Sequence, residues 1–424
     1  MELKKYKLAD IADFNKSSIS RFETFKEIIY LDTSSITENV VSDTAIINIK
    51  DAPSRAQRKV TNNTIIYSTV RPILKHYGIL SCPQNNFIVS TGFATIDIKD
   101  SYKHKIDPRY LYLLLTQQTI TNYIGNIADT AVSAYPSINP SDLSSLCFMF
   151  PDYNIQKTIA DIWNNYDCKI ALNRSINHNL EAMAKQLYDY WFVQFDFPDD
   201  EGKPYKSSGG KMVWNEKLKR EVPALWEAKL VDDVAEVFNG ATPSTADELN
   251  YGGNIVWITP KDLSDQKHKF VYHGERNISQ MGYDSCSTHL LPINTILMSS
   301  RAPIGLLSIA KTELCTNQGF KSFVPKEESM AAYLYYYLQI HIKQIEQLGT
   351  GTTFKEVSRE DILKFSILKP SNETLDLWEE YMTTINDRQL ELQKENENLT
   401  KLRDELLPLL MNGQVSVNYD LSHG

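Results

Sequence analysis

The stretch that decides the fold is residues 154–192, which read NIQKTIADIWNNYDCKIALNRSINHNLEAMAKQLYDYWF. Its pattern returns in residues 372–411, which read NETLDLWEEYMTTINDRQLELQKENENLTKLRDELLPLLM. Adding 219 to a residue number in the first stretch gives its partner in the second. Apolar residues recur at alternating steps of three and four over four to five heptads, which is typical of a coiled coil. Forty helical residues span about 60 Å. The sequence therefore predicts two long helices that pack antiparallel.

One apolar row with a step of seven residues is predicted to form the seam between these helices. Its members are Ile159, Tyr166, Leu180, Leu187, Trp378, Ile385, Leu392, Leu399 and Leu406. A second row is expected to follow Ile155, Ile162, Lys169, Ile176, Met183 and Tyr190. Polar residues interrupt the seam at Lys169, Asn173, Arg388 and Gln389, and such residues commonly fix the register of a coiled coil. The alternative is that each long helix lies on a domain of its own.

Composition places the chain among ordinary globular proteins. Its 424 residues suggest two to three domains, and 42% of them are hydrophobic while 23% are charged. There is no run of 18 apolar residues, so we expect no transmembrane helix, and the first residues lack the apolar core of a signal peptide. The five cysteines form no C-x-x-C pair. We expect reduced, mostly buried thiols in a cytoplasmic protein.

The negative charge is unevenly distributed. The net charge is −9, but residues 1–150 carry 16 Lys and Arg against 14 Asp and Glu, which gives +2. Residues 371–424 carry 4 against 11, which gives −7. The acid is therefore concentrated on the second long helix and its tail, where it is expected to be solvated or to dock a protein partner. The near-neutral remainder can carry local basic patches.

The chain is predicted to contain five segments. They are a mixed domain at 1–152, a first long helix at 153–197, a Pro/Gly/Ser-rich linker at 198–220, a second mixed domain at 221–370, and a second long helix with a tail at 371–424. In the first mixed domain, β-like runs at 45–49 and 64–67 precede a helix. We expect that helix over 108–115, because Pro108 suits its first turn.

The two mixed domains are weak repeats of each other. The matching pairs are Lys7-Leu8 with Lys229-Leu230, 67–73 with 298–304, 91–93 with 318–320, 110–112 with 333–335, and 135–143 with 354–362. We also take Arg71 and Arg301 to occupy matching positions, because each lies near a proline at the end of an apolar run, although the alignment of 67–73 with 298–304 sets them one residue apart. A chain of the order domain, helix, domain, helix is mapped onto itself by half a turn. Such a chain suits a target with two unlike half-sites.

The sequence lacks the motifs of a catalytic or cofactor site. It contains no G-x-G-x-x-G, no G-x-x-x-x-G-K-S/T, no H-E-x-x-H and no Asp/Asn-Pro-Pro-Tyr/Phe, and its eight histidines have no metal-ligand spacing. Residues 198–203 superficially resemble the carboxylates of nucleases, but they are crowded into the Gly/Pro-rich linker. We predict that the chain performs no catalysis and holds no metal.

Several motifs are spread along the chain in a fixed order. They are YDYWFVQFDF at 188–197, NGATPS at 239–244, WITPKDL at 257–263, SRAPIG at 300–305, CTNQGFK at 315–321, GTTF at 351–354 and LLPLLMNG at 406–413. Together they resemble the specificity subunit of a Type I restriction–modification system, over nearly the whole chain. The first mixed domain matches least, as expected of a module that varies with the DNA sequence it reads.

This resemblance implies an α/β (α+β) fold in which a long antiparallel two-helix coiled coil separates two pseudo-symmetric target-recognition domains. It also implies a non-catalytic subunit that directs two adenine methyltransferase subunits, and ATP-dependent restriction subunits, to a bipartite asymmetric double-stranded DNA target. The S-adenosylmethionine and ATP would be used by those partners. The alternative is a coiled-coil scaffold that docks proteins without binding DNA.

Basic and amide side chains on loops are the candidate DNA contacts, since arginine and lysine neutralise phosphates and arginine also forks onto guanine. The candidates are Arg55, Arg58, Lys59, Arg71, Lys75, Thr242, Lys261, Arg301, Gln318, Lys321 and Lys355. Arg55, Arg58 and Lys59 are predicted to form a basic cluster, for which the alternative is a mobile charged loop. For each lysine the alternative is a solvated surface charge, and for Arg71 and Arg301 it is a structural ion pair. Tyr135 and Phe354 are expected to pack at the entry to the long helices, and the alternative is that they contact DNA.

Overall fold

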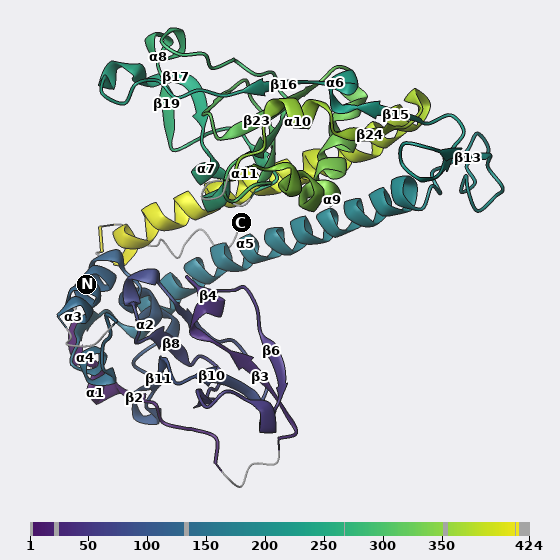
Figure 1. Cartoon of the computed structure of the whole chain (residues 1–424). Helices are drawn as coiled ribbons and strands as arrows, with labels where there is room; N and C mark the ends of the chain where they lie inside the picture. The colour runs from purple at the N-terminus through teal and green to yellow at the C-terminus, as the bar shows by residue number, and fades with distance from the viewer. Residues whose placement is uncertain are drawn as a thin grey trace, which may run out of the picture. The chain divides into compact units, whose positions relative to one another are not determined.

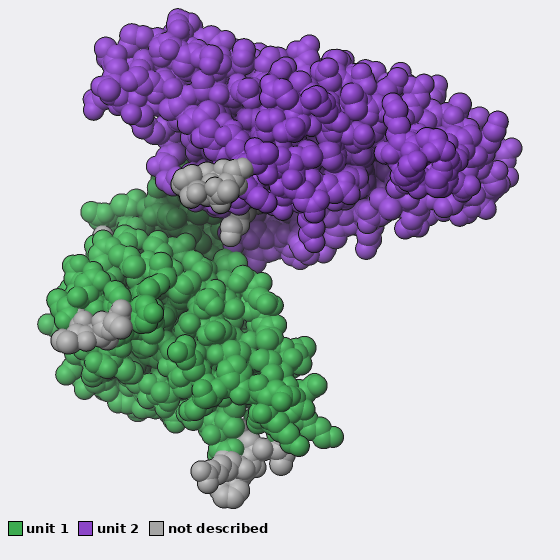
Figure 2. Space-filling view, viewed as in Figure 1, with its two compact units in different colours: residues 1–170, 399–424 green, residues 171–398 purple. Residues whose placement is uncertain are grey.

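The computed structural model describes residues 3–20, 25–130, 135–266, 268–350, 355–411 and 413–414. The chain divides into two compact units, drawn in green and purple in Figure 2. Unit 1 comprises residues 1–170 and 399–424, and unit 2 comprises residues 171–398. Each unit combines β-sheets and short helices with part of the long helices α5 (Tyr153–Tyr188) and α11 (Asn372–Met411), which Figure 1 labels. The predicted mixed α/β class with two long helices is confirmed.

Unit 1 contains two four-stranded sheets, with the orders β2-β11-β8-β9 and β6-β3-β10-β7. Its strands are β1 (Lys4–Lys7), β2 (Ala12–Phe14), β3 (Glu27–Leu31), β4 (Ile36–Thr37), β5 (Val40–Val41), β6 (Ala45–Asn48), β7 (Ala56–Lys59), β8 (Ile65–Ser68), β9 (Tyr77–Ile79), β10 (Phe87–Ser90), β11 (Phe93–Ile98) and β12 (Cys147–Phe150). Its short helices are α1 (Leu8–Ile11), α2 (Pro108–Leu115), α3 (Gln118–Asp129) and α4 (Pro140–Ser144). Helix α2 has the predicted bounds, because Pro108 fits its first turn and the Asp107 carboxylate accepts the Arg109 backbone N–H at its start.

Unit 2 contains a five-stranded sheet of order β16-β23-β20-β21-β18 and a three-stranded sheet of order β19-β17-β22. Its strands are β13 (Met212–Asn215), β14 (Arg220–Pro223), β15 (Glu227–Leu230), β16 (Ala235–Asn239), β17 (Tyr251–Ile258), β18 (Phe270–Val271), β19 (Arg276–Ile278), β20 (Ile296–Ser299), β21 (Leu307–Ala310), β22 (Cys315–Thr316), β23 (Phe320–Pro325) and β24 (Ser366–Lys369). Its short helices are α6 (Val231–Val234), α7 (Pro260–Gln266), α8 (Gln280–Asp284), α9 (Ala331–Leu348) and α10 (Arg359–Leu363). Strand β13 lies inside the segment predicted as a linker.

The two units share one scaffold, and the structure corrects its alignment. Strands β2-β11-β8-β9 of unit 1 recur as β16-β23-β20-β21 in unit 2, and the β1–β12 pair recurs as β15–β24. The Leu8 N–H donates to the carbonyl of Leu146, and the Val231 N–H donates to that of Phe365, both at 2.9 Å. Leu8 therefore matches Val231, so the predicted pairing of Leu8 with Leu230 was wrong by one residue. Such a slip turns every side chain of a strand to the opposite face.

The long helices pack antiparallel, as contacts within each unit show. In unit 1, Ile159 near the start of α5 shares a hydrophobic cluster with Leu410 near the end of α11. In unit 2, Asn173 in the second half of α5 donates from Nδ2 to Glu395 of α11 at 2.7 Å. Asn173 is fully buried, so this amide contact can fix the register of the two helices.

Every residue of the predicted seam is buried or half-buried, and Ile159, Trp378 and Leu392 are at most 2% exposed. The second predicted row is wrong over its later part, since Lys169 is exposed and Met183 is 58% exposed. The buried second row follows Gln156, Trp163, Ile170 and Ala184 instead. It lies one residue further along the chain, which is a rotation of about 100° around the helix axis. Of the four predicted polar interruptions, Lys169 and Arg388 face solvent, whereas Asn173 and Gln389 are buried.

An aromatic cluster forms much of the core of unit 2. Trp378 of α11 is fully buried, and its ring centroid lies 5.0 Å from that of Phe192 and 5.5 Å from that of Trp191. Both partners belong to a π-helical turn, Asp189–Val193, that continues α5. The cluster therefore joins the end of α5 to the start of α11 inside one unit.

Two further predictions concern the burial of the cysteines and the presence of membrane-spanning helices. Cys82, Cys147 and Cys168 are exposed free thiols and only Cys315 is buried, so the prediction of mostly buried thiols was wrong. Cys82 and Cys147 lie in a loop and on a two-stranded edge, where packing does not cover them. Over the described ranges, none of the helices has the length and apolar character needed to cross a membrane.

Candidate nucleic-acid interface

Three of the predicted DNA contacts meet in one cleft of unit 2. Arg301, Gln318 and Lys321 line a hollow of about 450 Å³. Strand geometry explains this, because Arg301 follows β20 and Lys321 stands in β23, and these strands pair antiparallel with Ser299 opposite Phe320. The other lining residues are Asn239, Gly240, Thr350, Glu356, Ser358, Arg359 and Glu360. We call this hollow the Arg301 cleft.

A carboxylate that the sequence analysis missed joins two of these cations. Glu356 Oε2 lies 3.0 Å from Arg301 Nε, and Glu356 Oε1 lies 3.4 Å from Lys321 Nζ. The exposed fraction rises from 5% for the Lys321 side chain through 36% for Glu356 to 50% for Arg301. Lys321 is thus a buried charge that needs its partner, whereas Arg301 is open to solvent. Glu356 stands 55 residues after Arg301, and no local pattern announces the pair.

The remaining candidates of unit 2 are placed differently from one another. The Thr242 hydroxyl donates to Gln318 Oε1, which brings these two predicted residues together beside the cleft. Lys261 lies on α7, where it pairs with Glu275 at 2.9 Å, and the hydrogen bond to that carboxylate raises its pKa. Lys355 is exposed next to Glu356.

In unit 1, Arg71 and Lys75 flank the 3-10 turn Pro72–Leu74, and both have left-handed backbones, with φ of 46° and 57°. The Arg71 guanidinium lies 5.0 Å from the ring centroid of Tyr135, which is 60% exposed, so Tyr135 does not pack at a helix entry. Lys75 pairs with Glu38 at 2.6 Å. Phe354, the predicted partner of Tyr135, lies outside the described residues.

The basic residues at 55–59 do not form one cluster. Arg55 is exposed in the turn before β7, while Arg58 and Lys59 are half-buried on that strand. Consecutive residues of a strand point to opposite faces, so the Arg58 and Lys59 side chains diverge. Arg58 Nη1 lies 3.4 Å from the Ser18 hydroxyl, on the segment that pairs with β7.

The two predicted arginines are not equivalent. Ser300 accepts a hydrogen bond from the Val357 N–H, and Thr69 accepts one from the Ile138 N–H. The next residue then forms an isolated β-bridge, which joins Arg301 to Glu356 in unit 2 and Val70 to Ser137 in unit 1. Arg301 therefore matches Val70, and the predicted match of Arg301 with Arg71 was wrong by one residue.

The same comparison applies to the third member of the ion-paired group. Phe320 lies opposite Ser299 and Phe93 lies opposite Ser68, so Lys321 matches Ala94, which is fully buried. The group Arg301, Glu356 and Lys321 in unit 2 is thus replaced by Val70, Ser137 and Ala94 in unit 1. The common scaffold folds with either set.

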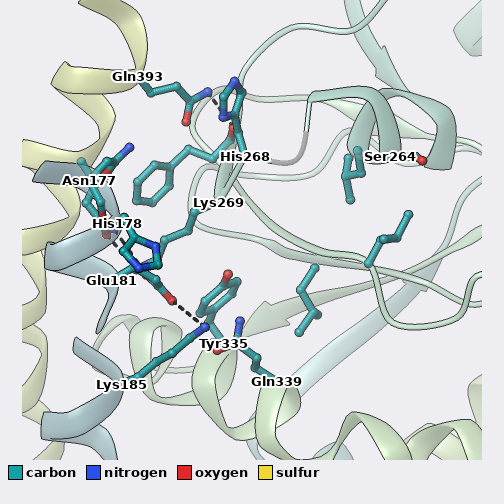
Figure 3. A pocket seen from close by; sticks show the side chains of 15 residues that line it. Asn177, His178, Glu181, Lys185, Ser264, His268, Lys269, Tyr335, Gln339 and Gln393 are labelled. Carbon is teal, nitrogen blue, oxygen red and sulfur yellow. Dashed lines mark hydrogen bonds and ion pairs between the residues drawn. The ribbon is translucent and has the colours of Figure 1, made fainter. Parts of the chain in front are cut away.

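A second cleft, of about 510 Å³, lies within unit 2 beside the long helices (Figure 3). Its buried cation is Lys269, whose Nζ lies 2.7 Å from the Tyr336 hydroxyl, 3.0 Å from Gln389 Oε1 of α11 and 3.1 Å from Glu181 Oε2 of α5. Burial lowers the pKa of Lys269 to about 8, although Glu181 opposes that shift. This cleft contains none of the predicted DNA contacts. Lys269 holds the β-sheet domain of unit 2 to both long helices.

Comparison with known proteins gives consistent matches. The model of the Type I restriction modification DNA specificity domain matches residues 1–182 and 223–401. The chain is 28% identical to the Type I restriction enzyme HindI specificity subunit of Haemophilus influenzae, over 97% of this chain and 99% of that protein. It is 36% identical to the MjaIX specificity subunit of Methanocaldococcus jannaschii, over 46% of this chain and 47% of that protein.

A solved structure shares the fold. The S subunit of a Type I restriction–modification system from M. genitalium matches with a TM-score of 0.61 at 15% identity, over 97% of this chain and 96% of that one. At this identity the match supports the architecture and leaves the side chains of the Arg301 cleft to be interpreted on their own.

Proposed function

The chain belongs to the family of Type I restriction–modification DNA specificity subunits, and from that premise we propose that each of its two units reads one half of a bipartite, asymmetric DNA target. The family is non-catalytic. What remains to be argued is how this chain divides the reading and which partners perform the chemistry.

The observation that carries the proposal is one scaffold with two sets of loop side chains. At matching positions unit 2 presents the ion-paired Arg301, whereas unit 1 presents Val70, which is 42% exposed. Arginine offers hydrogen-bond donors to a guanine edge, and an apolar side chain can contact a thymine methyl group. Two halves with unlike side chains would select unlike half-sites, so the target would be asymmetric.

The long helices would set the gap between the half-sites. Their 36 and 40 residues correspond to about 54 and 60 Å of helix, and the buried amide of Asn173 fixes their register. The acidic outer face of α11 offers a docking surface for methyltransferase subunits. We propose that those subunits, with ATP-dependent restriction subunits, bind the S-adenosylmethionine and ATP that the reaction uses.

Duplex binding as a function of salt tests the reading role. The chain assembled with its methyltransferase subunits should bind DNA with an affinity that falls steeply as salt rises, because each neutralised phosphate contributes about −0.9 to the slope of log K against log salt. A protein-docking scaffold would show no such binding. The purified chain alone should neither methylate nor cleave DNA with S-adenosylmethionine and ATP present, and stoichiometric methyl transfer by it would overturn the assignment of catalysis to partners.

A further inference from the structure

We propose that Arg301 reads a guanine in one half-site and that Glu356 is the positioning residue that aims it. The inference rests on the proposed function and goes further by naming the base and the reading group. It starts from the three charged side chains of the Arg301 cleft, which form a series from buried to exposed.

The guanidinium of Arg301 is held at one end and open at the other. Its Nε donates to Glu356 Oε2 at 3.0 Å, and half of the side chain is exposed. Over the described part of the chain, the structure gives Nη1 and Nη2 no protein acceptor. These two nitrogens form a planar fork that matches the O6 and N7 acceptors of guanine in the major groove. A fork whose stem is already fixed loses less conformational freedom on binding.

The Glu356 carboxylate is itself held in place by Lys321. Its second oxygen faces Lys321 Nζ at 3.4 Å, and only 5% of the Lys321 side chain is exposed. A buried ammonium requires a partner, so Lys321 holds the carboxylate in the cleft. One carboxylate between two cations also leaves this group with a net positive charge toward DNA.

The other unit shows that the fold does not need this group. The matching positions carry Val70, Ser137 and Ala94, and the strands around them pair in the same way. An ion-paired group required by the scaffold would be expected in both units. Its presence in one alone assigns it to the target of that unit. A phosphate clamp is the competing role, and it differs in being indifferent to base identity.

Replacing guanine by 7-deazaguanine removes the N7 acceptor and leaves base pairing intact. The target is first identified by sequencing methylated adenines, and each guanine in it is then replaced in turn. The assembled methyltransferase complex should lose roughly 5- to 100-fold in affinity at one guanine. Arg301→Ala should lose a similar factor on the natural duplex and become insensitive to that replacement.

The Glu356 variants separate positioning from charge. Glu356→Gln should reduce the 7-deazaguanine effect and relax the preference at that base pair, whereas Glu356→Asp should restore part of it. Glu275→Gln, which removes the acid of the exposed Lys261 pair, is the matched control and should leave the effect unchanged. If Glu356→Gln does not fold because Lys321 loses its partner, the double variant Glu356→Gln with Lys321→Met replaces it.

Three results would overturn the inference. They are a target in which no guanine is sensitive to 7-deaza replacement, an Arg301→Ala complex that keeps that sensitivity, and an Arg301→Ala complex in which only the salt slope changes, by about one unit. The proposed function fails separately, if the wild-type complex shows no preference for the target over random duplex.

Discussion

Each unit joins its β-sheet domain to α5 by an ion pair, but the two pairs differ in burial. In unit 1 Arg109 of α2 pairs with Asp161 of α5 at 2.6 Å, and Arg403 of α11 pairs with Asp167 of α5 at 2.8 Å. In unit 2 the β-domain supplies the cation Lys269, α5 supplies Glu181, and α11 supplies the neutral amide of Gln389. The pair that ties the domain to α5 is thus more buried in unit 2, where the Lys269 and Glu181 side chains are 10% and 22% exposed, than in unit 1, where Arg109 and Asp161 are 23% and 48% exposed.

A further contrast lies in the loops after β8 and β20, where unit 2 carries the ion-paired Arg301 and unit 1 carries the neutral Val70 at the matching position. One scaffold therefore tolerates exchange of its charged groups at both the helix junction and the loops. The lesson is that the apolar seam and the strand pairing define the fold, and that the polar groups are free to differ.

The largest expected difference concerns the seam. Trp378 and Ile159 match in the helix alignment, and both are at most 2% exposed. Trp378→Ala should destabilise unit 2 by about 3–5 kcal/mol, because it empties the aromatic cluster, and Ile159→Ala should destabilise unit 1 by about 2–4 kcal/mol. Hydrogen exchange by mass spectrometry, followed separately in each unit, measures both. If the backbone amides of variant and wild type were equally protected from exchange, the predicted role of these seam residues would be wrong.

Lys269→Met tests the junction of unit 2. It leaves the largely buried Glu181 with the more exposed and more distant Lys185, at 3.7 Å, as its remaining cation, and we expect a loss of about 3 kcal/mol in unfolding free energy. The double variant Lys269→Met with Glu181→Leu should recover most of that loss, since apolar side chains replace a buried pair at little cost. The matched change in unit 1, Arg403→Met, should cost less, because that pair is more exposed, at 24% and 22% against 10% and 22%. An equal loss of unfolding free energy in Lys269→Met and Arg403→Met would contradict the predicted difference between the two ion pairs.

The dependence of stability on pH should also differ between the two units. Lys269 has a pKa near 8 in the folded chain and about 10.4 when unfolded, so between these values the unfolded state binds more protons. The contribution of Lys269 to the stability of unit 2 should therefore rise with pH, by at most about 1.4 kcal/mol per unit. In unit 1, burial of Arg403 is outweighed by Asp404 and Asp167, which raise its pKa, so it stays charged. Denaturant unfolding of the wild type and of Lys269→Met between pH 7.5 and 9.5 measures this contribution. A difference in unfolding free energy between the two proteins that does not change with pH would contradict the prediction.

The helices as a spacer predict a change in DNA rather than in stability. Four residues inserted between Asn173 and Ile176 add about 6 Å of helix, close to two base pairs. Both half-sites should keep their bases while the gap between them lengthens by one or two base pairs. Altered half-site bases with an unchanged gap would show that the helices do not set the spacing.

Local and repeated signals were readable from the sequence. Helix α2 was predicted to the residue because Pro108 marks its first turn, and the long helices followed from their apolar period. Errors arose where one residue decides the outcome. Arg71 and Arg301 both lie near a proline, yet the alignment of 67–73 with 298–304 and the strand pairing set them one position apart.

The rest depended on distant pairing. Glu356 and Lys269 carry no local signal, since their partners stand 55 and 88 residues away. Arg58 and Lys59 looked like a cluster until the strand placed them on opposite faces. Sequence reasoning therefore found the loops that gather at the Arg301 cleft but missed the carboxylate that organises it.

The central claim is that this chain alone chooses the DNA, with a separate unit for each half-site. The most direct measurement is sequencing of methylated adenines in cells that carry the wild-type gene, no gene, or the Arg301→Ala variant. We expect one bipartite motif that disappears without the gene, and a variant motif relaxed in one half and unchanged in the other. A motif that survives deletion of the gene, or that changes in both halves at once, would contradict the account.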